Sequence, residues 1–244
     1  MQTVTGVLEP GYTLPVLDHG HVRYIDHMGS DLRVVEAARV SYRSPSKGDE
    51  ADKKLLNYLY SHQHMSPFEM CKITFNIKMP IFVMRQYIRH RMQNVNEVSA
   101  RYTELPEEFY VPNGWRPQDT KNKQGSVEMG TWNPGMHHPF YGDLTATATD
   151  VLQDAYRHAY HAYKALLAAG VSKEMARFVI PVGIYTEFYS TWDLRNLLHF
   201  FGLRDDPHAQ WEHQQYGKAM KEITRLLFPW TIEAYETTRT QPKA

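Results

Sequence analysis

The chain has little of several features that restrict the class of a protein. It contains one cysteine, Cys71, among 244 residues, so no internal disulfide can form and a zinc site built from four cysteines is excluded. No apolar run approaches the length of a membrane-spanning helix, and the first residues lack the basic-then-apolar order of a signal peptide. These absences predict a soluble protein of the reducing cytoplasm that acts without a membrane.

An excess of charge of either sign is also missing. Lys and Arg total 27, and Asp and Glu total 27, so the formal net charge is zero. A general polyanion binder normally carries a basic excess, so nucleic acid is not an expected partner. The glycine fingerprint of a dinucleotide fold (GxGxxG) and the zinc motif HExxH do not occur, and the 13 histidines include no three at a recognisable ligand spacing. We therefore expect no metal.

What is present is typical of a globular protein, with 42% apolar and 22% charged residues. Neither an internal repeat nor a linker is evident, so we expect a single domain over residues 1–244. Residues 1–22 have little periodicity and read as an arm or an edge segment, with 1–20 as the N-terminal arm. Residues 111–140 are rich in proline and glycine and form an irregular insert loop, the kind of segment that is often functional.

Apolar periodicity predicts helices and strands in alternation. The expected helices cover 31–38 with Ser30 as N-cap, 50–62, a turn capped at Ser66, 81–88, 143–169 closed by Gly170, a short helix from 173 that stops at Pro181, 194–201 capped by Asp193 and ended by Gly202, and 206–229. The expected strands cover 73–79, where apolar and polar residues alternate, and 184–192.

The most unusual window is residues 85–101. It holds four arginines and one glutamate, which gives +3 in a chain whose total is zero. Arg85 and Arg89 are four residues apart on the expected helix, where like charges destabilise unless something compensates them. A bound anion would compensate them, because the planar guanidinium binds phosphate through two hydrogen bonds. The alternative is a basic helix end favoured by the helix dipole, and the charges alone leave both interpretations open.

Beyond this helix, Glu97, Ser99 and Arg101 alternate with apolar residues. In an extended segment they would share one face, which would place an acceptor, a hydroxyl and a cation in a row. An amphipathic surface strand explains the same pattern.

Longer motifs in and around this window resemble one known family. Arg89-His90-Arg91, seven residues and then Ser99, continued by Arg101-Tyr102, is similar to the signature of the flavin-dependent thymidylate synthases. The resemblance extends to residues 37–42, 62–69, 203–204 and 209–212, and covers roughly residues 20–235. It implies an α/β (α+β) fold with a central mixed sheet flanked by helices.

The resemblance also implies a reaction and its cofactors. Members of the family methylate dUMP to dTMP with 5,10-methylenetetrahydrofolate as carbon donor, NADPH as reductant and FAD as mediator. They assemble as homotetramers whose active sites lie at subunit interfaces. No glycine fingerprint is present, so flavin would be bound without a Rossmann turn.

By match to the family's motifs, two sets of site residues follow. The dUMP-binding set is Gln86, Arg89, Glu97, Ser99, Arg101, Arg177 and Arg204. The FAD-binding set is Ser41, Ser66, Glu69, Arg89, His90, Arg91, Asn96, Glu97, Arg195, His199 and Arg204.

Two of these residues are expected to act in catalysis, Arg204 and Ser99. A guanidinium against the uracil carbonyl would stabilise the negative charge that develops as the ring is activated, and a helix end at Gly202 could aim it. The alternative for Arg204 is an ion pair with Asp205 or Asp206. Ser99 has no evident base to activate it, so we expect it to bind the nucleotide rather than attack it.

Other signals have plainer interpretations. Tyr156, Tyr160 and Tyr163 form a helical stripe typical of a core or subunit interface. Cys71 lacks the proline-cysteine-histidine context of the conventional thymidylate synthases, so we expect an unreactive buried thiol. Two alternatives to the synthase stay open: a flavin protein that oxidises NADPH without methylating a nucleotide, and a nucleic-acid-binding module that uses residues 85–101.

Overall fold

A five-stranded antiparallel sheet forms the centre of the molecule. The computed structural model describes residues 8–123, 125–127, 130–142 and 144–240. The strand order is β1-β2-β3-β7-β4. The strands are β1 (Thr13–Val16), β2 (Gly20–Met28), β3 (Lys72–Pro80), β7 (Tyr185–Asp193) and β4 (Gln93–Glu97). The predicted helix-flanked central sheet is confirmed, and all its pairings are antiparallel rather than mixed.

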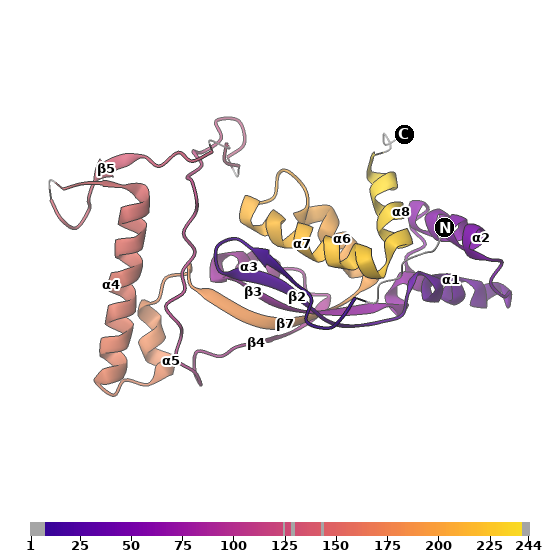
Figure 1. The fold of residues 1–244 in the computed structure, drawn as a ribbon, viewed down its shortest axis with the longest axis horizontal. Helices are drawn as coiled ribbons and strands as arrows, with labels where there is room; N and C mark the ends of the chain where they lie inside the picture. The colour runs from indigo at the N-terminus through magenta and orange to yellow at the C-terminus, as the bar shows by residue number, and fades with distance from the viewer. Residues whose placement is uncertain (1–7, 124, 128–129, 143, 241–244) are drawn as a thin grey trace.

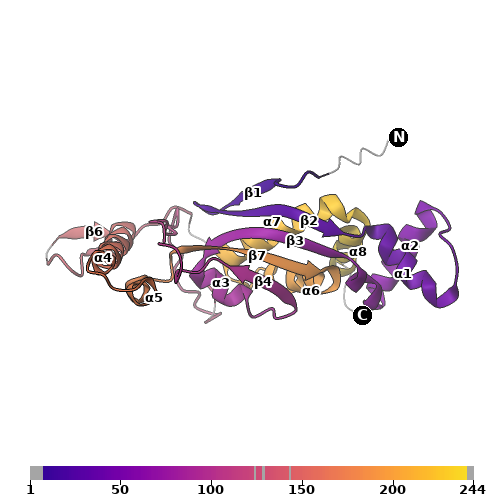
Figure 2. The same cartoon turned by 90° about the horizontal axis from the view of Figure 1, so that it is seen from below.

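The alternating pattern of β3 decides which face of the sheet becomes the core. Ile73, Phe75 and Ile77 are fully buried on one face, whereas Thr74 and Lys78 lie on the other. Across the ladder, Thr74 pairs with Thr191 and Lys78 with Glu187, so β7 repeats the alternation. Figure 2 shows the five strands side by side from the polar face, with α6, α7 and α8 behind them.

The helices lie over the apolar face and at both ends of the sheet. In Figure 1, α6, α7 and α8 cover one face, α1 and α2 lie beyond one end, and α4 and α5 stand at the other end. The α-helices are α1 (Asp31–Arg39), α2 (Asp49–Ser61), α3 (Ile81–Tyr87), α4 (Ala148–Ala168), α5 (Lys173–Ala176), α6 (Leu194–Arg204), α7 (Trp211–Leu227) and α8 (Pro229–Thr240). Short 3₁₀ turns are η1 (Val40–Tyr42), η2 (Ser66–Met70) and η3 (Arg177–Val179). None of the described helices is long and apolar enough to span a membrane.

The N-terminal segment is an edge of the sheet rather than a free arm. Residues 13–16 pair with β2, which already begins at Gly20, so the edge interpretation holds for this part. Residues 1–7 of the predicted arm lie outside the described part of the chain. The predicted cap at Ser66 is one residue late, because Met65 precedes the 3₁₀ turn that starts at Ser66.

Two predicted helix ends near Arg204 are wrong. Gly202 does not end α6; the helix continues to Arg204, and the Gly202 carbonyl accepts a hydrogen bond from Arg239 at 2.9 Å. The following helix begins at Trp211 rather than at residue 206, because the Asp206 carboxylate instead closes a turn with the His208 amide at 2.9 Å. Pro229 ends that helix as predicted but also opens α8, since proline suits the first helical turn.

The 111–140 insert is largely irregular and leads into α4. Its residues 135–137 form β5 (Gly135–His137), which pairs with β6 (Thr145–Thr147). The helix predicted from residue 143 therefore starts at Ala148, and Thr147 and Asp150 form a capping box. Within the predicted tyrosine stripe Tyr163 is fully buried, and Tyr156 stacks on Phe109 at 4.5 Å.

Candidate functional site

A guanidinium and a neutral imidazole form the centre of the candidate site. The Nε of Arg204, at the end of α6, donates a hydrogen bond to Nε2 of His90 at 2.8 Å. His90 lies three residues after α3, and its ring meets the edge of Phe200 at 4.9 Å. Burial, then the nearby Arg204 and His199, lower the pKa of His90 to about 4. His90 is therefore neutral at pH 7 and accepts this bond without cancelling the charge of Arg204.

The terminal amino groups of Arg204 have no hydrogen-bond or ion-pair partner among the described residues. Asp205 and Asp206, the expected alternative partners, pair with Lys221 and Arg239 instead. Gly202 lies inside α6, so the predicted aiming of Arg204 by a helix-ending glycine is wrong. The bond to His90 holds it instead.

The neighbouring arginines are also uncompensated. On a helix, the consecutive residues Arg89, His90 and Arg91 would point about 100° apart and could not all face one ligand. Helix α3 ends at Tyr87, so this run lies beyond the helix and can engage one ligand. The side chains of Arg85, Arg89 and Arg91 are exposed and form no hydrogen bond or ion pair with any described residue. This leaves several cations for an anion to bind.

A second group of predicted dUMP-binding residues, Ser99, Arg101 and Arg177, lies at or near α5 and is called the α5 group. Glu174 accepts a hydrogen bond from Nε of Arg101 at 3.1 Å, and its backbone carbonyl accepts one from Nε of Arg177 at 3.3 Å. Ser99 Oγ accepts the Arg101 amide at 3.3 Å, in a turn where the expected extended segment has already ended at Glu97. Glu97 does not share a face with them; it accepts a bond from Thr186 Oγ1 at 2.6 Å.

The predicted dUMP-binding residues around Arg204 and those around Arg101 are separate within one protomer. No hydrogen bond or ion pair in the described part of the chain joins the Arg204 group to the Arg101 group. Figure 1 shows why: α5 lies beside α4 at one end of the molecule, whereas α6 lies with α7 over the sheet.

Five of the predicted flavin residues form a third group around the start of α6. Ser41, Ser66 and Arg195 line a hollow of about 520 Å³, and a second hollow of about 520 Å³, which shares Arg195, reaches His199. Glu69 forms an ion pair with Arg195. Asn96 and Glu97 line a different hollow of about 420 Å³ beside β4.

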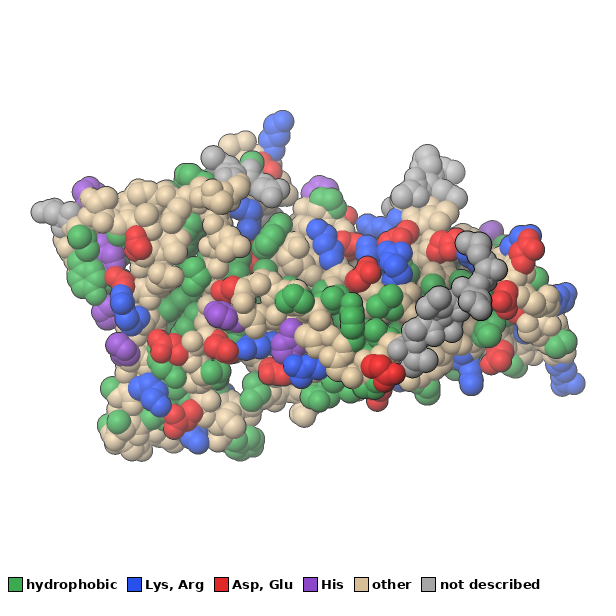
Figure 3. All heavy atoms as spheres, in the orientation of Figure 1, with side chains coloured by type: hydrophobic (Ala, Val, Ile, Leu, Met, Phe, Trp, Pro, Cys, Tyr) green, Lys and Arg blue, Asp and Glu red, His purple; other side chains and the backbone are tan. Residues whose placement is uncertain are grey.

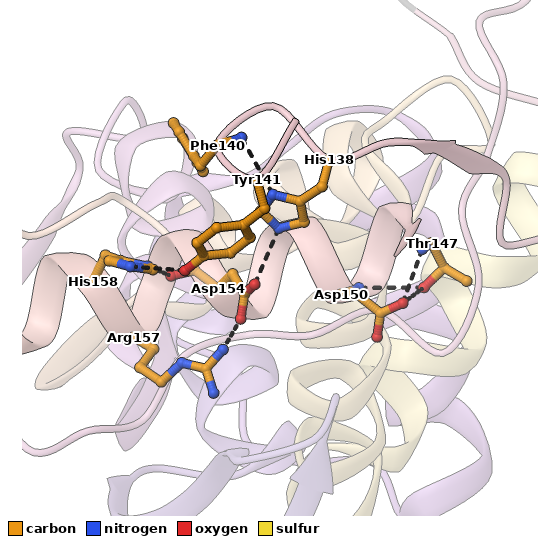
Figure 4. Close-up of polar contacts among 8 residues, drawn as sticks. All are labelled: His138, Phe140, Tyr141, Thr147, Asp150, Asp154, Arg157 and His158. Atoms are coloured by element: carbon orange, nitrogen blue, oxygen red, sulfur yellow. Dashed lines mark hydrogen bonds and ion pairs between the residues drawn. The ribbon is translucent and has the colours of Figure 1, made fainter. Parts of the chain in front are cut away.

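The described residues contain no cluster of three or more metal-ligating side chains. His138, beside α4, and His158, on α4, contact protein groups instead (Figure 4). Nε2 of His138 contacts Asp154 at 3.0 Å, and Nε2 of His158 contacts the Tyr141 hydroxyl at 3.1 Å.

Comparisons with known proteins agree on one family. The family model described as thymidylate synthase complementing protein matches residues 23–230. A flavin-dependent thymidylate synthase of Thermus thermophilus is 46% identical over 94% of this chain and 80% of its own length. One from Thermosipho africanus is 43% identical over 90% of this chain and 92% of its own. A crystal structure of the UMP/dUMP methylase PolB from Streptomyces cacaoi, bound with 5-Br UMP, has a TM-score of 0.76 at 32% identity, covering 93% of this chain and 98% of that one.

The chain belongs to the flavin-dependent thymidylate synthase family.

The flavin that this family uses fits the third group chemically. Hydroxyls of Ser41 and Ser66 and the guanidinium of Arg195 converge on one hollow, and such donors suit the phosphates of FAD. The loop that carries Ser41 is anchored, because buried Asp52 pairs with Arg39 and accepts the Ser46 hydroxyl. Asp193 is the N-cap of α6, as predicted: its carboxylate accepts the Asn196 amide at 2.9 Å.

Cys71 cannot act as a nucleophile in this member of the family. Its side chain is fully buried, and burial raises the pKa of its thiol to about 11. The expected burial of this thiol is therefore confirmed, and its raised pKa disfavours the reactive thiolate.

Residues 210–213 connect to the site in a way that the sequence did not reveal. The side chain of Gln86 bonds to that of Gln210, which donates to Glu212 at 3.0 Å; buried Glu212 also pairs with Arg116 at 2.5 Å. His213 is fully buried, and neither of its ring nitrogens has a hydrogen-bond partner among the described residues. Residues 209–212 belong to a motif of the family resemblance, but this motif does not include His213.

Proposed function

We propose that this protein makes dTMP from dUMP by reductive methylation, with FAD as its flavin. The family membership and the likeness to a UMP/dUMP methylase support the flavin and the nucleotide. The structural observation that carries the proposal is the Arg204–His90 pair, a cation held by a neutral acceptor beside three unpaired arginines. Bound FAD would take reducing equivalents from NADPH and pass them to the carbon supplied by 5,10-methylenetetrahydrofolate.

In this proposal Arg204 is the electrophilic residue. Its terminal amino groups face the uracil carbonyl and stabilise the negative charge that develops when the ring is activated. Gln86 and Arg89 bind the same nucleotide. Because no carboxylate of the described residues pairs with Arg204, its full charge is available to the substrate.

Residues of the α5 group hold the other end of the nucleotide. Arg101 and Arg177 suit a phosphate, and Ser99 donates a hydrogen bond to it; Glu97 accepts from the nucleotide. A phosphate that binds Arg101 has to displace Glu174, which forms an ion pair with Arg101. Both side chains of this pair are half-exposed, so the ion pair is weak.

A homotetramer would bring the predicted FAD-binding and dUMP-binding residues together from different protomers. Ser41, Ser66, Glu69, Arg195 and His199 would hold FAD from one protomer, while Arg89, His90, Arg91, Asn96 and Glu97 of another would close the site. Within a single protomer Asn96 and Glu97 line a different hollow from Ser41, Ser66 and Arg195, which supports this assignment, as does the exposure of Arg89 and Arg91.

The test is an anaerobic incubation of the FAD-loaded protein with dUMP, methylenetetrahydrofolate and NADPH, with dTMP measured by mass spectrometry. We expect dTMP that disappears when FAD is omitted, and at least a 100-fold loss of turnover in Arg204→Ala, as for other removed transition-state donors (about 10²–10³). UMP replaces dUMP in a parallel reaction, because the similar protein from Streptomyces cacaoi is a UMP/dUMP methylase.

Other outcomes would favour the alternatives. NADPH oxidation that ignores dUMP would indicate a flavin oxidase. Binding of nucleic acid that weakens steeply with salt and ignores dUMP would indicate a nucleic-acid module. On the face in Figure 3, basic and acidic side chains are interspersed over α7 and α8, where Lys221 pairs with Asp205, so that face offers no extended basic patch.

A further inference from the structure

One face of α7 forms the floor of the Arg204 site. Gln210, at the helix start, and His213 and Gly217 within it are spaced i, i+3 and i+7, so they lie on the same side. Gln210 bonds to Gln86 of α3. A Cβ on Gly217 would lie 3.5 Å from the carbonyl of Arg204, so α7 packs directly on the end of α6.

Between these two contacts, His213 is enclosed by aromatic rings. Its ring centroid lies 5.6 Å from that of Phe200 and 6.2 Å from that of Tyr87. Phe200 also contacts His90 at 4.9 Å, so the two imidazoles share one aromatic neighbour. His213 is fully buried, and both ring nitrogens lack hydrogen-bond partners in the described part of the chain, which costs stability that an apolar side chain here would not cost.

The charge state of His213 follows from its surroundings. Burial, then Arg204 and His90, lower the pKa of His213 to about 3. The ring is therefore neutral, and one of its nitrogens keeps a free lone pair. Arg204 itself is partly buried, and burial lowers its pKa, so the guanidinium has lost part of its solvation.

We propose that His213 is a positioning residue of this site: a second neutral imidazole, packed against Phe200, whose dipole stabilises the guanidinium of Arg204 without a hydrogen bond. No carboxylate of the described residues pairs with this guanidinium. A carboxylate would neutralise the cation and compete with the substrate. Neutral imidazoles stabilise the cation through their dipoles and leave its net charge for the nucleotide. This inference rests on the proposed function, because it takes dUMP as the ligand of Arg204.

The experiment compares four forms of the FAD-loaded protein: wild type, His213→Leu, His213→Asn and His213→Gln. Leucine fills the site without a polar atom, whereas the two amides place an acceptor near one or the other ring nitrogen. The dissociation constant of dUMP, the melting temperature, and kcat and KM for dTMP formation are measured for each. His213→Met is a second apolar variant in case leucine packs poorly.

We expect His213→Leu to melt at a higher temperature and to bind dUMP about 3- to 10-fold more weakly, the effect of one lost neutral interaction. One of the amide variants should restore the affinity to within about 2-fold. A residue with only a packing role would show the opposite: the apolar variants would bind dUMP like the wild type, and the amides would bring no rescue.

The outcomes separate this inference from the proposed function. Wild-type protein that binds dUMP without forming dTMP would contradict the proposed reaction, while the affinities of the variants would still decide the role of His213. If dUMP binds equally to wild type and to both apolar variants, the inference is wrong even when dTMP is made. Absence of dUMP binding by the wild type overturns both.

Discussion

A half-buried histidine, His90, and a fully buried one, His213, make the folded protein sensitive to acid. The pKa of His90 is lowered to about 4 and that of His213 to about 3, so the folded chain cannot take up these protons near pH 5. The unfolded chain takes them up below its ordinary histidine pKa of about 6.5. Stability is therefore fully present above pH 6.5 and falls as the pH decreases toward 4, because the unfolded state binds more protons.

His213→Leu isolates the contribution of one of these groups. Each fully buried neutral histidine should cost about 1.4 kcal/mol of unfolding free energy per pH unit below 6.5. We expect urea unfolding at pH 7, 6 and 5 to show a shallower decline in His213→Leu than in wild type. His161→Leu, at an exposed histidine of α4, is the matched control and should follow the wild-type curve. Identical slopes for all three proteins would contradict the assigned protonation states.

Ser99 has the contacts of a binding residue rather than of a nucleophile. Its hydroxyl accepts the Arg101 amide at 3.3 Å, and no imidazole or carboxylate of the described residues contacts it. A serine without a base stays protonated and reacts slowly. We therefore predict that Ser99→Ala raises the KM for dUMP by about 10- to 100-fold, the value of a hydrogen bond to a charged group, while turnover at saturating dUMP stays measurable.

Steady-state kinetics of Ser99→Ala beside Ser61→Ala, an exposed serine on α2, check this prediction. The control should match the wild type. Complete loss of turnover at saturating dUMP in a flavin-loaded Ser99→Ala protein would instead assign Ser99 to the chemical step.

At the scale of elements, local signals were sufficient wherever one turn or one ladder decides the structure. The alternation in 73–79 predicted β3, and Asp193 predicted the start of α6 because its carboxylate bonds an amide three residues away. The helix end predicted at Gly202 was wrong, because a glycine ends a helix only when the chain turns there. Here the helix continues, and Arg239 from the far end of the chain donates a hydrogen bond to the Gly202 carbonyl. Contacts so distant in sequence leave no periodic signal.

The start of α8 depends on such a distant contact. Asp31, the first residue of α1, is buried and accepts the amides of Trp230 at 2.8 Å and Thr231 at 3.1 Å. It therefore caps α8 from 200 residues away in sequence. Asp31→Ala should lower the unfolding free energy by about 1–3 kcal/mol, because two amides lose their acceptor in a buried place. Asp31→Asn keeps one acceptor oxygen and should lose less; equal losses in urea unfolding would argue against the cap.

The turn between β5 and β6 is held to α4 by His138. The Phe140 amide donates to Nδ1 of this buried ring at 3.2 Å, so Nε2 carries the proton and donates to Asp154 (Figure 4). Asp154 also pairs with Arg157, which fixes the carboxylate. We predict that His138→Ala increases hydrogen exchange in residues 135–147 by at least 10-fold, as expected when about 1.4 kcal/mol of local stability is lost.

His137→Ala is the matched control, because His137 is the exposed neighbour of His138. Exchange in this segment should stay at the wild-type rate in the control. A rise in exchange across the whole chain of His138→Ala would show that His138 supports the global fold rather than this turn.

At the scale of the whole molecule, the sequence predicted residues for the site but not their arrangement. The motif around Arg89 and Ser99 was specific enough to predict the family, which the comparisons confirm. The bond from Arg204 to His90 joins residues 114 positions apart, and the unpaired His213 becomes visible only when α7 packs on α6. The separation of Arg101 from Arg204 could not be predicted, since a motif says which residues meet a ligand but not which protomer supplies them.

That separation leads to a test of the proposed homotetramer. If one active site takes Arg204 from one protomer and Arg101 from another, Arg204→Ala and Arg101→Ala are each inactive alone but complement each other in mixed tetramers. Random mixing at equal amounts leaves both arginines intact in about one quarter of the sites, so co-expressed variants should recover about one quarter of wild-type turnover. Arg101→Ala mixed with Arg177→Ala is the control, because both guanidiniums bond to Glu174 of one protomer and no mixed site regains both. Turnover that stays at the level of the single variants, in tetramers verified by native mass spectrometry, would place Arg101 and Arg204 of the same chain in one site and require α5 to move toward α6.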